Sequence, residues 1–330
     1  MTRNALTVAF DASTRDRRSV ADSWGEAGPV LWLVDAATPD ERAGMLRRAA
    51  AVLVQHTGKD LRRDEWPLLA GAQLLQAITA GVDYMPLREL PPALPVACNG
   101  GAYAEPMAEH GAAMALAAAK RLFAEHAELR AGHFNQFQPN AMLAGGVCSI
   151  LGFGGIGAVV ARLMRAFGMR IHAINRRGTS EEPTEWIGVP QDIDALLEAA
   201  DILFVTAPLS TATEGVIDAD ALGRMKENAI LVNLARGELI DERALYNHLQ
   251  ARPAFTACLD AWWVEPIRHG AFRVDTPLLD LPNVIGSPHN SASVGGRWRP
   301  VVLARAVANC ARAARGETPL HLIRPEERMQ

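Results

Sequence analysis

The stretch Val147-Cys148-Ser149-Ile150-Leu151-Gly152-Phe153-Gly154-Gly155-Ile156-Gly157 decides the fold of this 330-residue chain. Its apolar first half predicts a buried strand, and the sequence from Ala158 to Met164 continues with helical spacing. Glycines between a strand and a helix allow a tight turn, close approach of a pyrophosphate, and close packing of the helix on the strand. The pyrophosphate would lie at the positive end of the helix. The stretch therefore predicts a dinucleotide-binding unit; the alternative is a glycine-rich turn without a ligand.

The next expected strand, Arg170 to Ile174, ends in Asn175-Arg176-Arg177. An acidic residue at this place usually binds the ribose of NAD, whereas an arginine accommodates the additional phosphate of NADP. This chain has no carboxylate there and has two consecutive arginines. The pattern predicts a preference for NADP(H). The alternative is that NAD(H) is accepted through Asn175, with both arginines solvated.

Composition excludes several classes of protein. Hydrophobic residues make up 49% and charged residues 21% of the chain, and the net charge is -4. These values are typical of a globular protein, and the absence of a basic field argues against nucleic acid as a partner. The four cysteines are far apart and form neither a zinc motif nor a disulfide framework. Since we find no signal peptide and no membrane-spanning stretch, we expect a cytoplasmic protein that does not bind membranes.

Two blocks of alternating strands and helices organise the chain. In the first block we expect strands at 6–10, 30–34, 51–54, 74–79 and 96–98, with a capped helix from Thr38 to about Ala50. In the second block we expect strands at 147–151, 170–174, 202–205, 229–232, 256–259 and 284–285. A long alanine-rich helix from Tyr103 to Arg130 connects the blocks, and a further helix runs from Ser293 to Arg315.

This alternation predicts an α/β fold with two doubly wound parallel-sheet lobes. We expect a Rossmann cofactor domain at 101–290, inserted into a flavodoxin-like substrate domain made of 1–100 and 291–330. The final segment is too short for a domain of its own, so we expect it to pack on the first block. A cleft between two hinged lobes would be a natural place for a ligand.

Three motifs follow expected strands of the second block. They are Asn233-Leu234-Ala235-Arg236-Gly237, Asp260-Ala261-Trp262-Trp263-Val264-Glu265-Pro266 and Ser287-Pro288-His289. Because all strands of a parallel sheet end at one edge, Arg236, Glu265 and His289 can converge where the dinucleotide lies. Each residue alone could be structural: a strand cap, a surface charge and a loop histidine.

Together these motifs resemble the D-isomer-specific 2-hydroxyacid dehydrogenases. The resemblance extends over nearly the whole chain and includes Ala80-Gly81-Val82-Asp83 and Ala108-Glu109-His110. It implies reduction of a small 2-keto acid with Arg236, Glu265 and His289 as the catalytic residues. Chemistry agrees, because histidine can release a proton near neutral pH, a glutamate can orient its ring, and arginine offers a planar fork to a carboxylate.

The resemblance also implies further contacts. Backbone N–H groups around Ala80, Gly81 and Val82 would bind the substrate carboxylate, and Gln55 and His56, which leave a strand, are candidates for its side-chain pocket. Asp260 would accept a hydrogen bond from the nicotinamide carboxamide. The remaining cofactor contacts would come from Thr206, Ala207, Pro208, Thr213 and Ala235, together with His289. One of Trp262 and Trp263 could face the substrate while the other packs into the core.

Several alternatives remain open at this point. The principal hypothesis is a reductase of glyoxylate, hydroxypyruvate or a similar acid, acting as a homodimer and without a metal. A phosphoglycerate dehydrogenase is the enzymatic alternative, whereas a formate dehydrogenase would carry glutamine in place of Glu265. A dinucleotide-sensing corepressor on the same fold is the alternative from another class. The other histidines, His110 among them, are expected to be structural or exposed.

Overall fold

The computed structural model describes residues 3–294, 296 and 298–328. The chain forms two compact units, one made of Met1–Tyr103 and Val294–Gln330 and the other of Ala104–Ser293. The domain boundaries expected from the sequence, 100/101 and 290/291, lie slightly earlier in the chain. Residues 1, 2, 295, 297, 329 and 330 of the expected domains lie outside the described residues.

The first unit contains a five-stranded parallel sheet in the order β2-β1-β3-β4-β5. Its strands are β1 (Ala5–Val8), β2 (Val30–Trp32), β3 (Ala49–Val54), β4 (Leu74–Ala77) and β5 (Val96–Ala97). The central strands β1, β3 and β4 are buried at every position, as expected for parallel strands that are covered on both faces. This is the flavodoxin-like strand order, so the predicted architecture of this lobe is confirmed.

Helices cover both faces of this sheet. Helices α1 (Thr14–Trp24) and α11 (Arg299–Ala314) pack together, and α11 lies on β3 and β4. Helix α2 (Pro39–Arg48) packs on β1 and β3, and the short helix α3 (Thr57–Asp60) follows β3. The C-terminal segment therefore adds Val302, Leu303 and Val307 to the core formed by the N-terminal segment.

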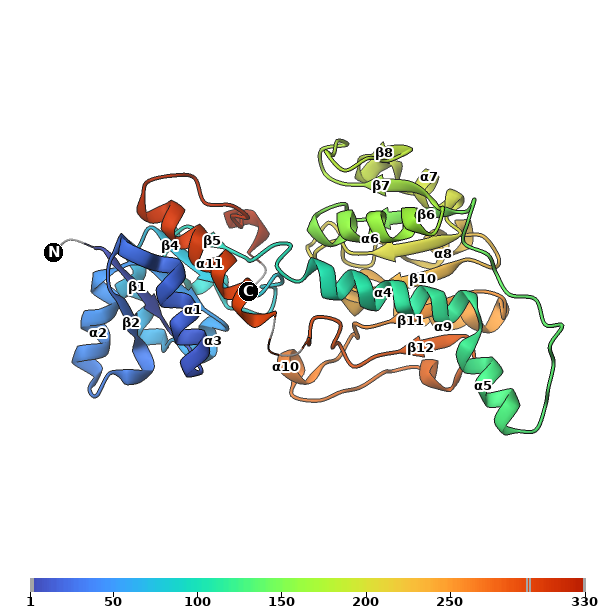
Figure 1. Cartoon of the computed structure of the whole chain (residues 1–330), viewed down its shortest axis with the longest axis horizontal. Coiled ribbons are helices and arrows are strands. Elements are labelled where there is room, and N and C mark those ends of the chain that lie inside the picture. Colours follow the sequence, from blue (N-terminus) through green and yellow to red (C-terminus); the bar gives the residue numbers. More distant parts are fainter. Residues whose placement is uncertain (1–2, 295, 297, 329–330) are drawn as a thin grey trace. The chain divides into compact units, whose positions relative to one another are not determined.

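The second unit contains a seven-stranded parallel sheet in the order β12-β11-β10-β9-β6-β7-β8 (Figure 1). Its strands are β6 (Val147–Leu151), β7 (Arg170–Ile174), β8 (Trp186–Gly188), β9 (Ile202–Val205), β10 (Ile230–Asn233), β11 (Thr256–Leu259) and β12 (Val284–Gly286). The chain runs outward from β6 to β7 and β8, then returns to add β9 on the other side. The Rossmann order and its switch point between β6 and β9 are thereby confirmed.

The helices of this unit also form two layers. Helices α4 (Ala104–Ala119) and α6 (Gly155–Ala166) pack against each other, and α4 also contacts β10 and β11. Helices α7 (Ile193–Ala199), α8 (Ala219–Arg224) and α9 (Glu242–Ala251) form the other layer, while α5 (Leu122–Arg130) and the short α10 (Pro266–His269) lie outside these layers (Figure 1). No described helix has both the length and the apolar character needed to cross a membrane.

The expected long helix from Tyr103 to Arg130 is wrong, because the chain breaks it into α4 and α5. Arg121 has φ 53, in the left-handed region, and ends the helical hydrogen bonding between the two helices. The returning chain supplies the reason: the Ala141 N–H donates to the Ala119 carbonyl at 3.0 Å and Lys120 Nζ donates to the Ala141 carbonyl at 2.7 Å. Sequence periodicity cannot detect such a tertiary cap.

Other expected boundaries are corrected by a few residues. The helix expected to reach Ala50 ends at Arg48, because Ala49 already belongs to β3. The strands expected at 6–10, 30–34 and 74–79 are shorter at their carboxyl ends, where the chain leaves the sheet for loops or a 3₁₀ turn. The helix expected from Ser293 begins at Arg299, and β8 was not expected at all.

Candidate active site

The glycine turn connects β6 to α6 in the centre of the larger sheet. Gly152 has φ +100, and a Cβ at this position would overlap the backbone of Ala207 in the loop after β9. Only glycine satisfies both conditions without strain. Gly154 differs, because it is exposed and a Cβ there would meet no atom within 4 Å. The turn is therefore closed on the β9 side and open above Gly154.

The amino-terminal end of α6 fits the pyrophosphate of a dinucleotide. Helix α6 begins at Gly155 with Gly154 as its N-cap, and no side chain caps it. The first backbone N–H groups of a helix have no acceptor within the helix, and they carry the positive end of its dipole. Since the exposed space above Gly154 is left open, these groups can bind an anion.

Asn175 organises the turn after β7. Its side-chain nitrogen donates to the Thr179 carbonyl at 2.9 Å, and its side-chain oxygen accepts a hydrogen bond from the Arg177 N–H at 2.9 Å. Arg176 and Arg177 are exposed on this turn. Both guanidinium groups therefore belong to the turn next to the glycine loop, while the Asn175 side chain is already engaged in hydrogen bonds.

The loop after β9 forms the other wall of the glycine turn. The Thr206 hydroxyl donates to the Gly152 carbonyl at 2.8 Å, which joins the two loops directly. The Thr213 hydroxyl donates to the Pro208 carbonyl at 2.7 Å and accepts a hydrogen bond from the Ser210 N–H at 2.8 Å. Thr206, Ala207 and Pro208 thus lie beside the fingerprint, whereas Thr213 closes the loop on itself.

Arg236 follows β10 in a tightly packed turn. Asn233 supports this turn, because its side chain donates to the Arg236 carbonyl at 2.8 Å and accepts a hydrogen bond from the Ala235 N–H at 3.0 Å. A Cβ on Gly237 would overlap the backbone of Trp262. The Arg236 turn is therefore pressed against the segment that leads to Glu265.

His289 and Glu265 form the charged centre of the site. His289 Nδ1 lies 2.8 Å from Glu265 Oε1 and 2.7 Å from Oε2. Glu265 is buried and also accepts a hydrogen bond from the Trp262 N–H at 2.8 Å. Because Nδ1 faces the carboxylate, Nε2 is the ring nitrogen left for another partner.

The ionisation of Glu265 is supported by its neighbours. Burial acts to raise its pKa, but the hydrogen bond from His289 and the charges of His289 and Arg236 outweigh burial, and the net pKa is lower than usual. Arg236 is thus near enough to act electrostatically on Glu265. The structure brings all three predicted catalytic residues together at the carboxyl edge of one sheet.

Asp260 directly follows β11 and is completely buried. Its Oδ1 accepts hydrogen bonds from the Ser287 hydroxyl at 2.6 Å and the Asn290 N–H at 3.1 Å, and its Oδ2 accepts one from the Ser291 N–H at 3.2 Å. His110 Nε2 lies 2.9 Å from the Ser287 hydroxyl oxygen. Sequence reasoning missed these roles of His110 and Ser287, although both belong to motifs that it had singled out.

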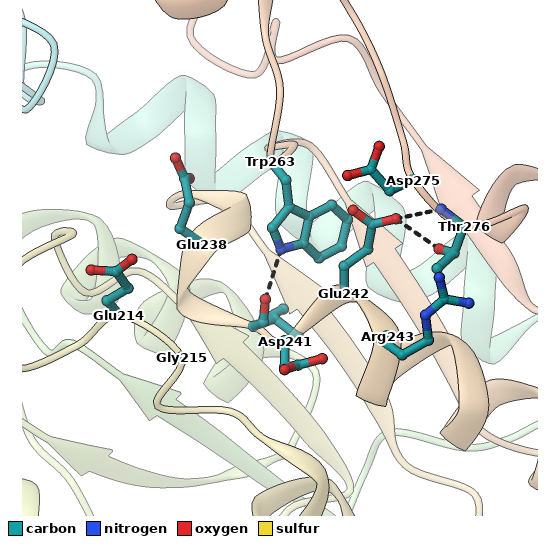
Figure 2. A pocket seen from close by; sticks show the side chains of 10 residues that line it. Glu214, Gly215, Glu238, Asp241, Glu242, Arg243, Trp263, Asp275 and Thr276 are labelled. Atoms are coloured by element: carbon teal, nitrogen blue, oxygen red, sulfur yellow. Dashed lines mark hydrogen bonds between the residues drawn. The ribbon is translucent and has the colours of Figure 1, made fainter.

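The two tryptophans have different surroundings. Trp262 is buried, its indole N–H donates to the Ser287 carbonyl at 2.8 Å, and its ring meets Phe272 edge-on. Trp263 is partly exposed, and its N–H donates to the Ile240 carbonyl at 2.7 Å. Figure 2 shows Trp263 among the residues that line a pocket. The pocket has a volume of about 470 Å³, and half of its lining residues carry carboxylates, namely Glu214, Glu238, Asp241, Glu242 and Asp275. Trp262 is therefore the core residue of the pair.

The predicted substrate residues of the first unit lie in the loops that follow β3 and β4. Asp60 Oδ2 accepts hydrogen bonds from the backbone N–H groups of Gln55 and His56, each at 2.6 Å. The ring of Tyr84 is tilted by 53° to that of His56, with 5.1 Å between the ring centroids, and the Tyr84 hydroxyl donates to the Thr79 hydroxyl at 3.2 Å. Burial lowers the pKa of His56, which favours the neutral ring. Ala80, Gly81 and Val82 follow β4 and are partly exposed.

Metal ligands are not grouped in the described part of the chain: no cluster of three or more His, Cys, Asp or Glu residues could hold an ion there. The fold and the site instead define a dinucleotide-binding protein of the Rossmann class. The family model described as "D-isomer specific 2-hydroxyacid dehydrogenase, NAD binding domain" matches residues 112–291. The chain therefore belongs to the D-isomer specific 2-hydroxyacid dehydrogenase family, which is a family of enzymes.

Comparison with individual proteins agrees with this assignment. The chain is 35% identical over 235 residues to the glyoxylate reductase of Korarchaeum cryptofilum, which covers 68% of each protein. It is 33% identical over 248 residues to the D-3-phosphoglycerate dehydrogenase of Methanocaldococcus jannaschii, covering 74% of this chain but only 46% of that protein. A solved structure of a glycerate dehydrogenase related protein from Thermoplasma acidophilum is 27% identical, with a TM-score of 0.62 and coverage of 92% of this chain and 98% of that one.

Proposed function

We propose that this protein reduces a small 2-keto acid of the glyoxylate or hydroxypyruvate type to the D-2-hydroxy acid. The observation that carries the proposal is the pairing of His289 Nδ1 with both oxygens of Glu265, at 2.8 and 2.7 Å, beside the charge of Arg236. The similarity to a glyoxylate reductase supports this substrate class.

The roles of the residues follow from their chemistry. Glu265 holds the imidazole by Nδ1, so the proton to be transferred is the one carried by Nε2. Arg236 presents a guanidinium fork that can bind the substrate carboxylate and polarise the neighbouring carbonyl. The reduced nicotinamide supplies the hydride when it is bound. His289 then donates its proton to the carbonyl oxygen, on which negative charge develops.

The dinucleotide would be held by the residues around the glycine turn. The backbone N–H groups at the start of α6 would bind the pyrophosphate, and the Thr206 to Pro208 loop, which is bonded to the glycine turn, would lie beside it. We propose that Arg176 and Arg177 give a preference for NADP(H), because the turn after β7 offers guanidinium groups and no carboxylate at the place that reads the ribose.

The first unit is proposed to contribute substrate contacts. The backbone around Gly81 would bind the carboxylate, and Gln55 and His56 would face the substrate side chain. Tyr84 links the loops of Gln55 and Thr79, since its hydroxyl oxygen lies 3.4 Å from the carbonyl oxygen of the former and 3.2 Å from the hydroxyl oxygen of the latter. These roles stay predictions.

A homodimer is also proposed, on the basis of an exposed apolar arm. Helix α5 and the segment that follows it extend away from the sheet of the second unit (Figure 1). This arm, residues 122–142, exposes the apolar side chains of Leu122, Phe123, Leu129, Phe134, Phe137 and Met142. Exposed apolar patches of this kind mark interaction sites, and a second copy would cover them. Sedimentation equilibrium tests this, and a monomer at micromolar concentration would contradict it.

The decisive experiment is a spectrophotometric screen of 2-keto acids against NADPH and NADH. We expect oxidation of NADPH with glyoxylate or hydroxypyruvate, and a loss on the order of 10²- to 10⁴-fold in turnover for His289→Ala with dinucleotide binding retained. Reduction of only the keto acid that corresponds to 3-phosphoglycerate would favour the phosphoglycerate dehydrogenase alternative, which the similarity to the Methanocaldococcus enzyme supports. Binding of NADPH without turnover of any acid would favour a sensing protein.

A further inference from the structure

His110 lies in a hydrogen-bonded chain that ends on the loop of His289. It belongs to α4, and the next residue, Gly111, packs so closely that a Cβ there would lie 2.6 Å from Leu234 Cδ1 and 3.0 Å from Phe204 Cε1. This close packing holds α4 against the ends of β9 and β10. His110 Nε2 thereby comes within 2.9 Å of the Ser287 hydroxyl oxygen, just after β12.

The protons in this chain can be assigned by counting donors. A serine hydroxyl has one proton. The shortest contact of the Ser287 hydroxyl, 2.6 Å, is its donation to the buried carboxylate of Asp260, so this proton is committed. The hydroxyl must then accept in its contact with His110, and His110 must carry a proton on Nε2. The order of donation is therefore from His110 to Ser287 and from Ser287 to Asp260.

Asp260 connects these hydrogen bonds to the loop that carries His289. It accepts N–H groups from Asn290 and Ser291 at 3.1 and 3.2 Å, directly after His289, and the Ser287 hydroxyl from two residues before it. His289 itself has φ 50, a left-handed conformation that is uncommon for residues other than glycine. Such a conformation persists when its surroundings determine it. The Asp260 carboxylate therefore fixes the loop before and after His289, the residue with the left-handed backbone conformation.

We propose that His110 is a positioning residue for His289. By donating from Nε2, it orients the Ser287 hydroxyl toward Asp260, and the Asp260 carboxylate then fixes the 287–291 loop so that the His289 ring faces Glu265. This inference rests on the proposed function for its effect on catalysis, but the chain of hydrogen bonds is independent of any substrate. His110 acts through other residues and is not assigned a contact with the reacting atoms.

The kinetic test compares His110→Leu with His110→Gln. Leucine removes the donor, whereas the glutamine amide nitrogen can take the place of Nε2. We expect His110→Leu to lower kcat for keto-acid reduction about 10- to 100-fold, the scale of a catalytic group displaced by about 1 Å, with KM changed less than about 3-fold. We expect His110→Gln to recover kcat to within about 3-fold of the parent. His248→Leu, at a partly exposed histidine of α9, is the matched control and should leave kcat unchanged.

The pathway of action is tested with Ser287→Ala. If His110 acts through Ser287, the double variant His110→Leu/Ser287→Ala should have nearly the same kcat as Ser287→Ala alone. If the loss of kcat in the double variant is instead the product of the losses in the two single variants, His110 acts by another route and the proposal is overturned. Ser287→Ala also serves if His110→Leu fails to fold.

A spectroscopic readout separates this proposal from the proposed function. Long-range ¹H–¹⁵N spectra of histidine-labelled protein without substrate should show His110 with its proton on Nε2. The His289 ring signals should shift in His110→Leu and return toward the parent in His110→Gln. A proton found only on Nδ1 of His110, or His289 signals unchanged in His110→Leu, would overturn the positioning role. Because no turnover is needed, this result stands even if none of the keto acids is reduced.

Discussion

Replacement of two neighbouring glycines by alanine should separate dinucleotide binding from folding. At Gly154 the backbone φ is -111 and a Cβ would meet no atom within 4 Å, so alanine fits the folded chain. Loss of glycine lowers the entropy of the unfolded chain, whereas alanine is a poorer N-cap for α6 than glycine, so we expect the free energy of unfolding to change by less than about 1 kcal/mol. The same methyl group would occupy the space through which the pyrophosphate approaches. We expect Kd for NADPH to rise at least about tenfold, which corresponds to about 1.4 kcal/mol.

Gly152→Ala is the opposite case. A left-handed conformation costs alanine about 1–2 kcal/mol, and overlap of the new Cβ with the Ala207 backbone adds roughly 1–3 kcal/mol. The free energy of unfolding of the second unit should therefore fall by about 2–5 kcal/mol, and each kcal/mol lowers Tm by about 2–4 °C in a domain of this size. Dinucleotide binding would be lost together with stability.

Two assays distinguish the variants. Thermal unfolding without cofactor reports stability, and titration of NADPH fluorescence reports Kd. The reasoning is refuted if Gly154→Ala binds NADPH as tightly as the parent, because the open space above the turn would then have no role in binding. A Gly152→Ala variant with the parental Tm would show that the turn does not have the conformation described here.

Three further predictions concern Arg236, Glu265 and His248. Arg236→Lys should lower kcat/KM on the order of 10²-fold, since an ammonium group cannot form a bidentate pair with a carboxylate; near-parental kinetics would contradict the assigned fork. Reduction needs protonated His289, so kcat should fall as pH rises. The lowered pKa of Glu265 keeps its carboxylate ionised beside His289, and Glu265→Gln removes this negative charge, so the fall in kcat should move to lower pH. An unchanged pH profile would exclude the His289–Glu265 pair from catalysis. Burial and the charge of Arg252 lower the pKa of His248 to about 4. The unfolded chain therefore takes up a proton as pH falls from about 6.5 to about 4 while the folded chain does not, and the free energy of unfolding should drop across this window. After a discount for the partial exposure of the ring, this loss of stability is roughly 1–2 kcal/mol. His248→Phe keeps the edge-on contact with Phe255, and it should abolish this part of the loss when urea unfolding is compared at pH 7 and pH 5. An equal loss in the parent and the variant would assign the loss to other groups.

Much of the candidate site could be predicted because its residues belong to short motifs that each follow a strand. The glycine turn, Arg236, Glu265 and His289 each follow a strand of a parallel sheet, and such strands end at one edge whatever their order. The positions along the chain therefore already place these residues on the same side of the sheet. Asn175-Arg176-Arg177 was found in the same way, from its place at the end of the second strand of the unit.

The break between α4 and α5 could not be predicted, because it depends on the return of the chain at Ala141. The contact of His110 with Ser287 is another such case, since it joins residues separated by 177 positions and is brought about by the packing of α4 on the strands. A histidine within an alanine-rich helix carries no local signal of that partner.

The amino-acid sequence by itself determined the alternation of strands and helices, the dinucleotide turn and the identity of the charged residues, because these depend on residue type and spacing along a few turns of chain. Only the tertiary structure decided that the Gly237 turn packs against the Trp262 segment and that Glu265 is buried against His289. It also decided that Asp260 fixes the loop on both sides of His289, whose backbone has a left-handed conformation. These features arise where segments far apart in the chain pack closely, and close packing is a property of the folded surfaces that no local pattern contains.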